Sequence, residues 1–423
     1  MISSPSRADA GPARTVLPNG LTVLSEFVPG VRSVALGAWV RAASVHEPRE
    51  RMGVSHLLEH MVFKGTRSRD ARAIALALES LGGSLDAYTA REHTSFQARA
   101  LDEHLGVAAD VLGDLVFRPL LRADDLALER KVVLEEIGTV EDTPDDLVFE
   151  LHNEAMWGAH PYGYQILGTR ETVSALGVRE LRELHDRAYN PAQVVVACAG
   201  NVRHEALLAA LERAGWMALP RGDDRPLPTP AVTAPAPAVR HVEREGAQTH
   251  IVFGSRTVPY ADPRRYAVAL VDTILGGGMS SRLFQRVREE LGLAYDVHSF
   301  QSFHPDAGVH GVYVGTSPDT AADAARAVMD ELSRLAAGSL TAEELASGKR
   351  QLAGSVTLSL ESVRARMYRA AESELYGVPF HSLDETLALI DAITPAEVAA
   401  VCREFYDPAG QTVLSLGPEP AIP

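Results

Sequence analysis

Apolar residues alternate with polar ones in some stretches and recur at helical spacing in others, and these two patterns predict the elements. Two apolar runs around Pro18-Asn19-Gly20 are typical of a β-hairpin, expected here over Thr15–Glu26. Further strands are expected at Val31–Ala42, Leu85–Thr89, Thr94–Ala100 and Val194–Gly200. Helices are expected at Gly53–Gly65, Ala71–Leu81, Asp102–Leu115, Asp124–Val140, Asp146–Trp157 and Val178–Ala188. Hairpins mixed with helices predict an α+β fold, with mixed or antiparallel sheets covered by helices.

A proline-rich segment divides the chain into halves of similar length. Arg221–Ala238 has five prolines and no apolar periodicity, so we predict an extended linker there. A chain of 423 residues is long enough for more than one domain. We therefore expect a disordered tail at residues 1–14, an N-terminal domain at 15–220 and a C-terminal domain at 239–423.

The second half repeats a pattern of the first. His185–Gly200 and Cys402–Gly417 align without a gap at a tyrosine, a proline and the final glycine. Upstream, Leu121–Leu126 (LRADDL) matches Leu340–Leu345 (LTAEEL) at nearly the same offset. Two agreements in the same order predict that the chain consists of two duplicated α+β domains.

Charge and cysteine content narrow the range of partners and compartments. The formal net charge of −16 disfavours nucleic acid as a partner and is compatible with cationic or unfolded peptides. Cys198 and Cys402 are isolated, which favours a reducing, cytoplasmic location. The chain lacks an apolar run long enough to span a membrane, and its N-terminus lacks the apolar core of a secretory signal.

The stretch GVSHLLEHMVFKG, residues 53–65, carries the most distinctive chemistry. On a helix His56, Glu59 and His60 share one face, and the apolar residues between them indicate that the helix packs in a core. Two imidazoles at this spacing suit a divalent metal, with a carboxylate beside it. A buried stripe of this kind is costly unless a partner satisfies it. From this stretch alone, ordinary hydrogen-bonded histidines remain the alternative.

A catalytic zinc usually has three protein ligands, and LERKVVLEEI, residues 128–137, contains candidates for the third. Glu129 and Glu136 share one helical face with two valines, whereas Glu135 lies four residues after Lys131, as in a solvent-exposed ion pair. We therefore favour Glu136 over Glu135 as the ligand, with an ordinary surface acid as the alternative. Glu129, two turns earlier, could support a histidine ligand.

These assignments leave Glu59 without a ligand role. A carboxylate next to a metal site can take a proton from water, as a general base does. The reaction that this arrangement predicts is the hydrolysis of an amide bond.

The motifs together resemble the inverted-zincin peptidases of the pitrilysin and insulinase family, most closely the branch of the mitochondrial processing peptidase and its bacterial relatives. The resemblance rests on PNGLTV, GVSHLLEHMVFKGT, GGSLDAYTAREHTSF, ERKVVLEEI, EDTPDD and GGGMSSRLFQRVREELGLAY, which occur in one order. It implies one zinc ion per chain, bound by His56, His60 and Glu136. It also implies that Glu59 is the catalytic base and that Glu129 supports the zinc site.

The resemblance gives the second half a catalytic role as well. Members of the family use an arginine and a tyrosine seven residues apart, which correspond to Arg288 and Tyr295 here. Tyr295 would hydrogen-bond the oxyanion, and Arg288 would help to position the substrate or the tyrosine. Without the resemblance, an ordinary helix charge and a strand core residue would be the preferred interpretation of this pair.

The resemblance also implies substrate contacts. Leu85–Arg91, including Tyr88, Thr89 and Ala90, is similar to an edge strand to which an extended peptide adds. Phe63 matches an aromatic residue that contacts the residue after the cut. Asp146 and Glu150 match acids that receive an arginine just upstream of the cut; a solvated acidic helix start is the alternative.

The overall expectation is a zinc metalloendopeptidase that hydrolyses extended peptides or presequence-like segments. Family members of this length pair into a closed dimeric chamber, so a homodimer is expected. Two alternatives remain, a non-catalytic structural subunit like those in the core of a respiratory complex, and a peptide-binding module. Loss of the zinc or base residues would favour the structural subunit, and none is lost here.

Overall fold

The chain folds into two compact units, which we describe separately. The computed structural model describes residues 11–233 and 235–422. Unit 1 comprises residues 11–138, 164–230 and 358–382 of this described chain, and unit 2 comprises residues 139–163, 231–357 and 383–422.

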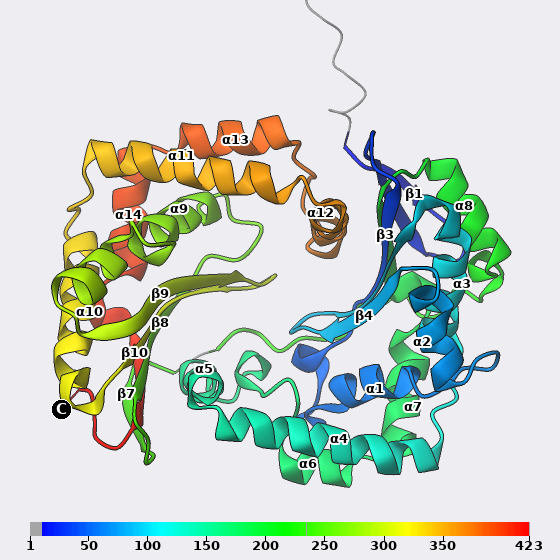
Figure 1. The fold of residues 1–423 in the computed structure, drawn as a ribbon, viewed down its shortest axis with the longest axis horizontal. Coiled ribbons are helices and arrows are strands. Elements are labelled where there is room, and N and C mark those ends of the chain that lie inside the picture. Colours follow the sequence, from blue (N-terminus) through cyan, green and yellow to red (C-terminus); the bar gives the residue numbers. More distant parts are fainter. Residues whose placement is uncertain (1–10, 234, 423) are drawn as a thin grey trace, which may run out of the picture. The chain divides into compact units, whose positions relative to one another are not determined.

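Unit 1 is built on a six-stranded sheet (Figure 1). Its strands are β1 (Ala13–Val16), β2 (Thr22–Phe27), β3 (Ser33–Val40), β4 (Ser84–Thr89), β5 (Thr94–Leu101) and β6 (Val194–Gly200). The order across the sheet is β1-β2-β6-β3-β5-β4, in which β2 and β6 run parallel and the other neighbouring pairs run antiparallel. β4 is therefore an edge strand, and the predicted hairpin at the start of the chain is confirmed.

The helices of unit 1 pack on the two faces of this sheet or against the helices that cover it. They are α1 (Val54–Val62), α2 (Ala71–Glu79), α3 (Leu105–Phe117), α4 (Ala123–Asp142), α6 (Arg170–Ala175), α7 (Val178–Ala188), α8 (His204–Arg213) and α12 (Val363–Leu375). Alternate residues of β3 point to opposite faces. Leu36 and Ala38 join the main core with α1, α3 and α8, whereas Ala35 and Trp39 pack with Met367 of α12.

Unit 2 contains a five-stranded sheet (Figure 1). Its strands are β7 (Val239–Glu243), β8 (Thr249–Thr257), β9 (Ala294–Phe303), β10 (Gly308–Thr316) and β11 (Thr412–Gly417). Its helices are α5 (Pro144–Trp157), α9 (Arg265–Gly276), a π-helix at Phe284–Glu290, α10 (Ala321–Ala336), α11 (Ala342–Ser359), α13 (Leu383–Ala392) and α14 (Pro395–Phe405). α9, α10 and α14 share the main core on one face, and α5 packs on the opposite face through Val148 and Ala155.

The two sheets have the same topology, which confirms the predicted duplication and the α+β fold. The order β2-β6-β3-β5-β4 in unit 1 corresponds to β7-β11-β8-β10-β9 in unit 2, and the first pair is parallel in both. The repeated sequences form the same turn before β6 and β11. In each turn a side-chain oxygen, of Asn190 or of Asp407, accepts a hydrogen bond from the backbone N–H two residues later.

The compact units differ from the contiguous domains expected at 15–220 and 239–423. α5 belongs to the first half of the chain but packs against β8 and β11 of unit 2. α12 belongs to the second half but packs against β2, β3 and β6 of unit 1. Since α5 follows α4 and α12 follows α11, the same helix of the repeat is exchanged in both directions. Amphipathicity predicts that such a helix packs, but it does not say against which sheet.

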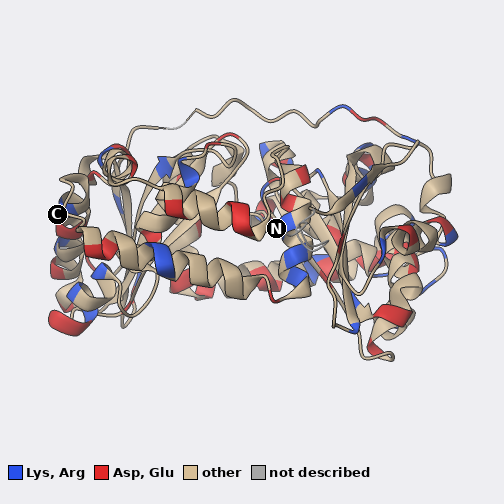
Figure 2. Ribbon diagram, turned by 90° about the horizontal axis from the view of Figure 1, so that it is seen from above, with Lys and Arg blue, Asp and Glu red and all other residues tan. Residues whose placement is uncertain are grey.

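The remaining segments bear on the expected tail and linker. Residues 1–10 of the expected tail lie outside the described residues, and Ala13 and Arg14 belong to β1, so the predicted boundary at residue 14 is too late. Where described, residues 221–238 contain neither helix nor strand (Figure 2). Acidic and basic residues are interspersed along the helices of each unit (Figure 2). In the part of the chain that the structure describes, no helix is long and apolar enough to cross a membrane.

Candidate active site

The candidate site is built on α1, and a buried carboxylate holds the start of this helix. Glu47 is 5% exposed and accepts hydrogen bonds from the backbone N–H groups of Gly53 and Ser55, each at 2.8 Å. The first N–H groups of a helix lack intrahelical partners, so these bonds satisfy two buried donors. Gly53 has a φ of 89°, and a Cβ there would lie 2.5 Å from the carbonyl oxygen of Leu167. The entry into α1 therefore requires glycine.

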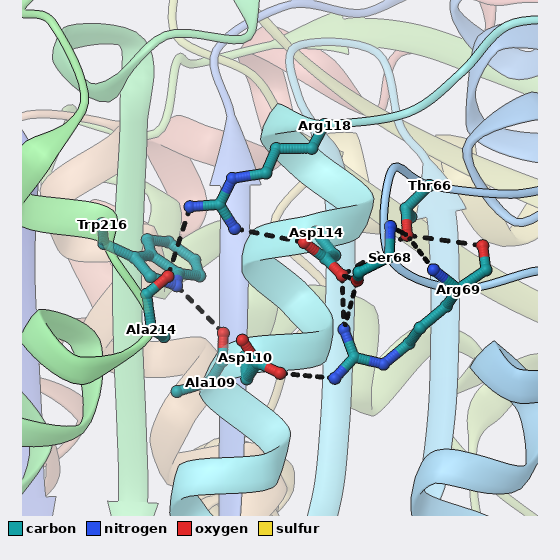
Figure 3. A network of polar contacts seen from close by, with 9 residues as sticks. All are labelled: Thr66, Ser68, Arg69, Ala109, Asp110, Asp114, Arg118, Ala214 and Trp216. Atoms are coloured by element: carbon teal, nitrogen blue, oxygen red, sulfur yellow. Dashed lines mark hydrogen bonds and ion pairs between the residues drawn. The ribbon is translucent and has the colours of Figure 1, made fainter.

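The loop after α1 is anchored to α3. Figure 3 shows Asp114 of α3 beside Thr66, Ser68 and Arg69 of this loop, with Arg118 on its other side. Arg69 and Ser68 both contact the carboxylate of Asp114, and Arg118 donates to it at 3.1 Å. Burial raises the pKa of Asp114, but the hydrogen bonds from Ser68 and Arg118 and the nearby positive charges outweigh this effect and lower it. A charged, fully engaged carboxylate thus fixes the loop next to α1.

His56, His60 and Glu136 converge, as predicted. Their ligand atoms lie within 4.8 Å of one another, and among the described residues this is the one group of three or more potential ligands found. Oε2 of Glu136 lies 3.8 Å from Nε2 of His56 and 3.5 Å from Nε2 of His60. The two histidines come from one face of α1 and the glutamate from α4, so a local motif and a distant helix make one site.

The chemistry of this group fits a zinc ion. Oε2 of Glu136 is buried and lacks a hydrogen-bond partner among the described residues, and so does Nδ1 of His56. Burial lowers the pKa of His56 to about 3, assisted by the positive charge of His60 when protonated. His56 is therefore neutral at physiological pH, as a metal ligand must be. Two imidazoles and one carboxylate form a common three-ligand set of catalytic zinc.

The helical register of α4 explains why Glu136 takes this position. Glu129, Val133 and Ile137 recur every four residues and are buried, and Glu136 lies beside them on that side. Glu135 is exposed, so the choice of Glu136 over Glu135 agrees with the geometry. One of the two valines expected on this face, Val132, is 45% exposed and does not line it, so that part of the prediction was wrong.

Glu129 contacts the predicted ligand His60 at the ring nitrogen that does not face Glu136. Its Oε1 lies 3.1 Å from Nδ1 of His60, and its Oε2 lies 2.5 Å from Nζ of Lys64. Its side chain is only 6% exposed. This position matches the supporting role expected for Glu129 and adds Lys64, for which the sequence pattern offered no signal.

Glu59 lies on the same face of α1 and is held from β4. Its Oε2 accepts a hydrogen bond from the hydroxyl of Thr89 at 2.6 Å, and the residue is 8% exposed. Burial raises the pKa of Glu59, although the bond from Thr89 and the charge of His60 act in the opposite direction. A carboxylate with a raised pKa is a stronger base than an ordinary one.

The predicted substrate residues of unit 1 have distinct environments. Tyr88 on the edge strand β4 stacks on Tyr368 of α12, with ring centroids 6.1 Å apart. Ala90 follows β4, and its N–H donates to the carbonyl of His93 at 2.9 Å. Phe63 ends α1 and is partly buried against the core.

Arg288 and Tyr295 form a pair within unit 2. The Arg288 guanidinium lies 5.1 Å from the centroid of the Tyr295 ring, which is a cation–π contact. The pairing of β9 with β10 shifts by one residue here, so that Tyr295 is the extra residue of a β-bulge on an edge strand. Tyr295 is 76% exposed, which excludes a strand core residue.

Asp146 and Glu150 also belong to unit 2, because they lie on α5. Asp146 is exposed in the first turn of this helix, and Glu150 is partly buried. The exchange of α5 therefore places these two acids in a different compact unit from His56, His60 and Glu136. From the sequence, both acids were expected in the N-terminal domain at residues 15–220.

Three residues near the site were missed or given another role. One of them, Glu47, binds backbone N–H groups across a turn. The other two, Lys64 and Thr89, each contact a glutamate that is distant in the sequence. Thr89 had been considered only as part of a peptide-binding strand. A buried acid six residues before Gly53 has no local signature, because its partners are backbone N–H groups.

Comparison with known proteins agrees with this architecture. Residues 22–170 match the model of the family described as insulinase (peptidase family M16), and residues 175–352 match the model of the peptidase M16 inactive domain. A protein of Streptomyces coelicolor described as an uncharacterized zinc protease is 40% identical over 92% of this chain and 86% of its own length. Another of the same description, from Bacillus subtilis, is 36% identical over 92% of this chain and 94% of its own length.

Solved structures show the same fold. A protease from Helicobacter pylori superposes with a TM-score of 0.91 at 20% identity, covering 96% of this chain and 99% of its own. A protein from Pseudomonas fluorescens, described as a peptidase M16 inactive domain, superposes with a TM-score of 0.90 at 23% identity, covering 98% and 99%.

Proposed function

Since the chain belongs to the insulinase family of peptidases, peptidase family M16, we propose that it is a zinc-dependent endopeptidase that hydrolyses extended peptides, including presequence-like segments. One observation carries the proposal, namely the convergence of His56, His60 and Glu136 in a group with the ligands of a catalytic zinc. Glu59, on the same face of α1 as the histidines, provides a carboxylate for proton transfer.

In this proposal His56, His60 and Glu136 hold one zinc ion. When bound, zinc supplies a Lewis acid that polarises a peptide carbonyl and acidifies water. Glu59 takes the proton of the attacking water and passes it to the leaving amine. Thr89 restricts the rotation of the Glu59 carboxylate by holding Oε2, which leaves Oε1 to receive the proton.

Unit 2 would contribute the donor for the developing oxyanion. A phenol exposed on a β-bulge is accessible to a ligand, and the adjacent guanidinium of Arg288 restricts the position of the ring. We assign the oxyanion contact to Tyr295 and the positioning of substrate or tyrosine to Arg288.

The substrate would add to the sheet of unit 1 as a further strand. β4 is an edge strand, so its outer N–H and C=O groups can pair with an extended peptide along Tyr88, Thr89 and Ala90. Phe63 would contact the residue after the cut. Asp146 and Glu150 would bind a basic residue just before it.

We further propose that the active form is a homodimer. This chain contains both the metal group and the Arg288–Tyr295 pair, so the reaction needs no second kind of chain. Light scattering coupled to gel filtration gives the mass directly. A monomer with full peptidase activity would contradict the proposed dimer.

The test of the function combines metal content with peptide cleavage. The wild-type chain should contain one zinc ion and cleave a quenched fluorescent peptide. Glu59→Gln should keep the zinc and lower turnover about 100-fold or more. A structural subunit or a peptide-binding module would show no turnover in the wild type, and unchanged turnover in Glu59→Gln would refute the role of the base.

A further inference from the structure

One carboxylate near the candidate metal group binds two partners, with one oxygen for each. Oε1 of Glu129 faces Nδ1 of His60 at 3.1 Å, and Oε2 faces Nζ of Lys64 at 2.5 Å. Lys64 follows His60 by four residues, so both partners come from α1 and the turn after it. The Glu129 side chain is 6% exposed and that of Lys64 is 34% exposed, so the carboxylate is largely shielded from water while the lysine is partly accessible.

The bond to His60 decides which imidazole nitrogen is available to a metal. A carboxylate that accepts the proton of Nδ1 fixes the tautomer in which Nε2 carries a lone pair. Nε2 of His60 is the atom that faces Glu136, at 3.5 Å. The orientation of Oε1 toward His60 is therefore a condition for the three-ligand group.

The identity of residue 64 matters because an ammonium and a guanidinium bind a carboxylate differently. Lysine is a point charge that can contact one oxygen and leave the other to a second partner, whereas arginine presents a planar fork that matches both oxygens at once. A fork at this position would compete with His60 for Oε1. The chain has only three lysines among its 40 basic residues, yet one of them occupies this position.

We propose that Lys64 is a positioning residue of the metal centre, a cation that holds Glu129 by Oε2 so that Oε1 orients His60, and that arginine cannot replace it. The inference rests on the proposed zinc site and extends it to a residue that binds neither metal nor substrate. It predicts that a positive charge at position 64 is not sufficient for metal binding with wild-type affinity.

The test compares Lys64→Arg with a matched control, Lys131→Arg, which makes the same change on the exposed side of α4. The full-length chain is stripped of metal and titrated with Co²⁺ against a chromophoric chelator, and the visible spectrum of bound cobalt is recorded. Lys131→Arg should match the wild type. Lys64→Arg should bind Co²⁺ about 10-fold to 100-fold more weakly and show a shifted cobalt spectrum, because the His60 ligand is misoriented. Wild-type affinity and spectrum in Lys64→Arg would overturn the proposal.

A second variant separates a folding defect from a positioning defect. Lys64→Met removes the cation and should also weaken Co²⁺ binding, while circular dichroism reports whether the chain is folded. If Lys64→Arg does not fold, wild-type Co²⁺ affinity in a folded Lys64→Met overturns the proposal instead. Absence of Co²⁺ binding by the wild type, or binding unchanged in His56→Ala, would overturn the zinc site and this inference with it. Failure of Lys64→Arg alone leaves the zinc site standing.

Discussion

The hydroxyl of Thr89 donates a hydrogen bond to Oε2 of Glu59 at 2.6 Å and thereby joins an edge strand to the candidate metal helix. The strand that is expected to bind the peptide is thus tied to the carboxylate that is expected to move the proton. In the proposed mechanism, this one contact links substrate binding along β4 with proton transfer at α1.

Removal of this contact should affect turnover more than binding. Thr89→Val keeps the shape of the side chain but loses the bond that restricts Glu59, and we expect kcat to fall about tenfold, the equivalent of one lost hydrogen bond to a charged group. KM and zinc content should stay near the wild-type values. Ser84→Ala, an exposed position on the same strand, serves as the control. Equal kcat in both variants would argue against a role for the contact.

Two adjacent glutamates on α4 provide a matched pair for the third ligand. Glu136→Gln should lose most of its zinc, because a neutral amide is a much weaker ligand than a carboxylate. Glu135→Gln should keep the zinc, since residue 135 is exposed and lies outside the group of potential ligands. Zinc is measured by elemental analysis after gel filtration. The opposite result for the pair would reassign the ligand.

Glu47 should be important for stability because it satisfies two buried N–H groups at the start of α1. Glu47→Ala leaves both donors without the carboxylate, and we expect a loss of about 3 kcal/mol in the free energy of unfolding, from the cost of buried unsatisfied donors. Urea denaturation followed by circular dichroism measures this change. Glu50→Ala removes a nearby exposed acid and should change stability little. A similar stability of the two variants would show that α1 does not depend on this cap.

Tyr295→Phe removes only the phenol hydroxyl. The ring and its contact with Arg288 remain, so the bulge on β9 should persist. If the hydroxyl stabilises the oxyanion, kcat should fall about 100-fold, as for the loss of one oxyanion donor. Zinc content should not change, and a loss of zinc would contradict the assigned role.

Stability should depend on pH through His152 on α5. Burial lowers the pKa of His152 to about 4, which outweighs the opposite effect of its hydrogen bond with the Thr412 carbonyl. In the unfolded chain the ordinary pKa of 6.5 applies, so that between pH 6.5 and about 4 the unfolded state binds protons more tightly. The contribution of His152 to stability is therefore complete above pH 6.5 and is lost as the pH falls toward 4. Thermal unfolding midpoints across this range should decline less steeply for His152→Gln, and an equal slope would exclude this origin.

Much of the candidate site was readable from local spacing. The positions of His56, Glu59 and His60 on one helical face follow from the helical period, and Glu136 was selected over Glu135 by the same rule on α4. These predictions succeeded because a helix determines which side chains share a face. Val132 is the exception: it is 45% exposed, because the helical period does not determine which flank of a face a neighbouring segment covers.

The duplicated α+β architecture, the first hairpin, the family and the stretch with the candidate metal ligands could all be inferred from local sequence patterns. The packing of the folded chain was needed to show that α5 and α12 are exchanged between the compact units and that Glu47 holds the start of α1. It was also needed to show that Lys64 contacts Glu129 and that Thr89 contacts Glu59. The physical reason is the range of the interactions. Periodicity records how a segment divides its own faces, but the partner of a buried face or carboxylate is selected by packing among segments far apart in the chain.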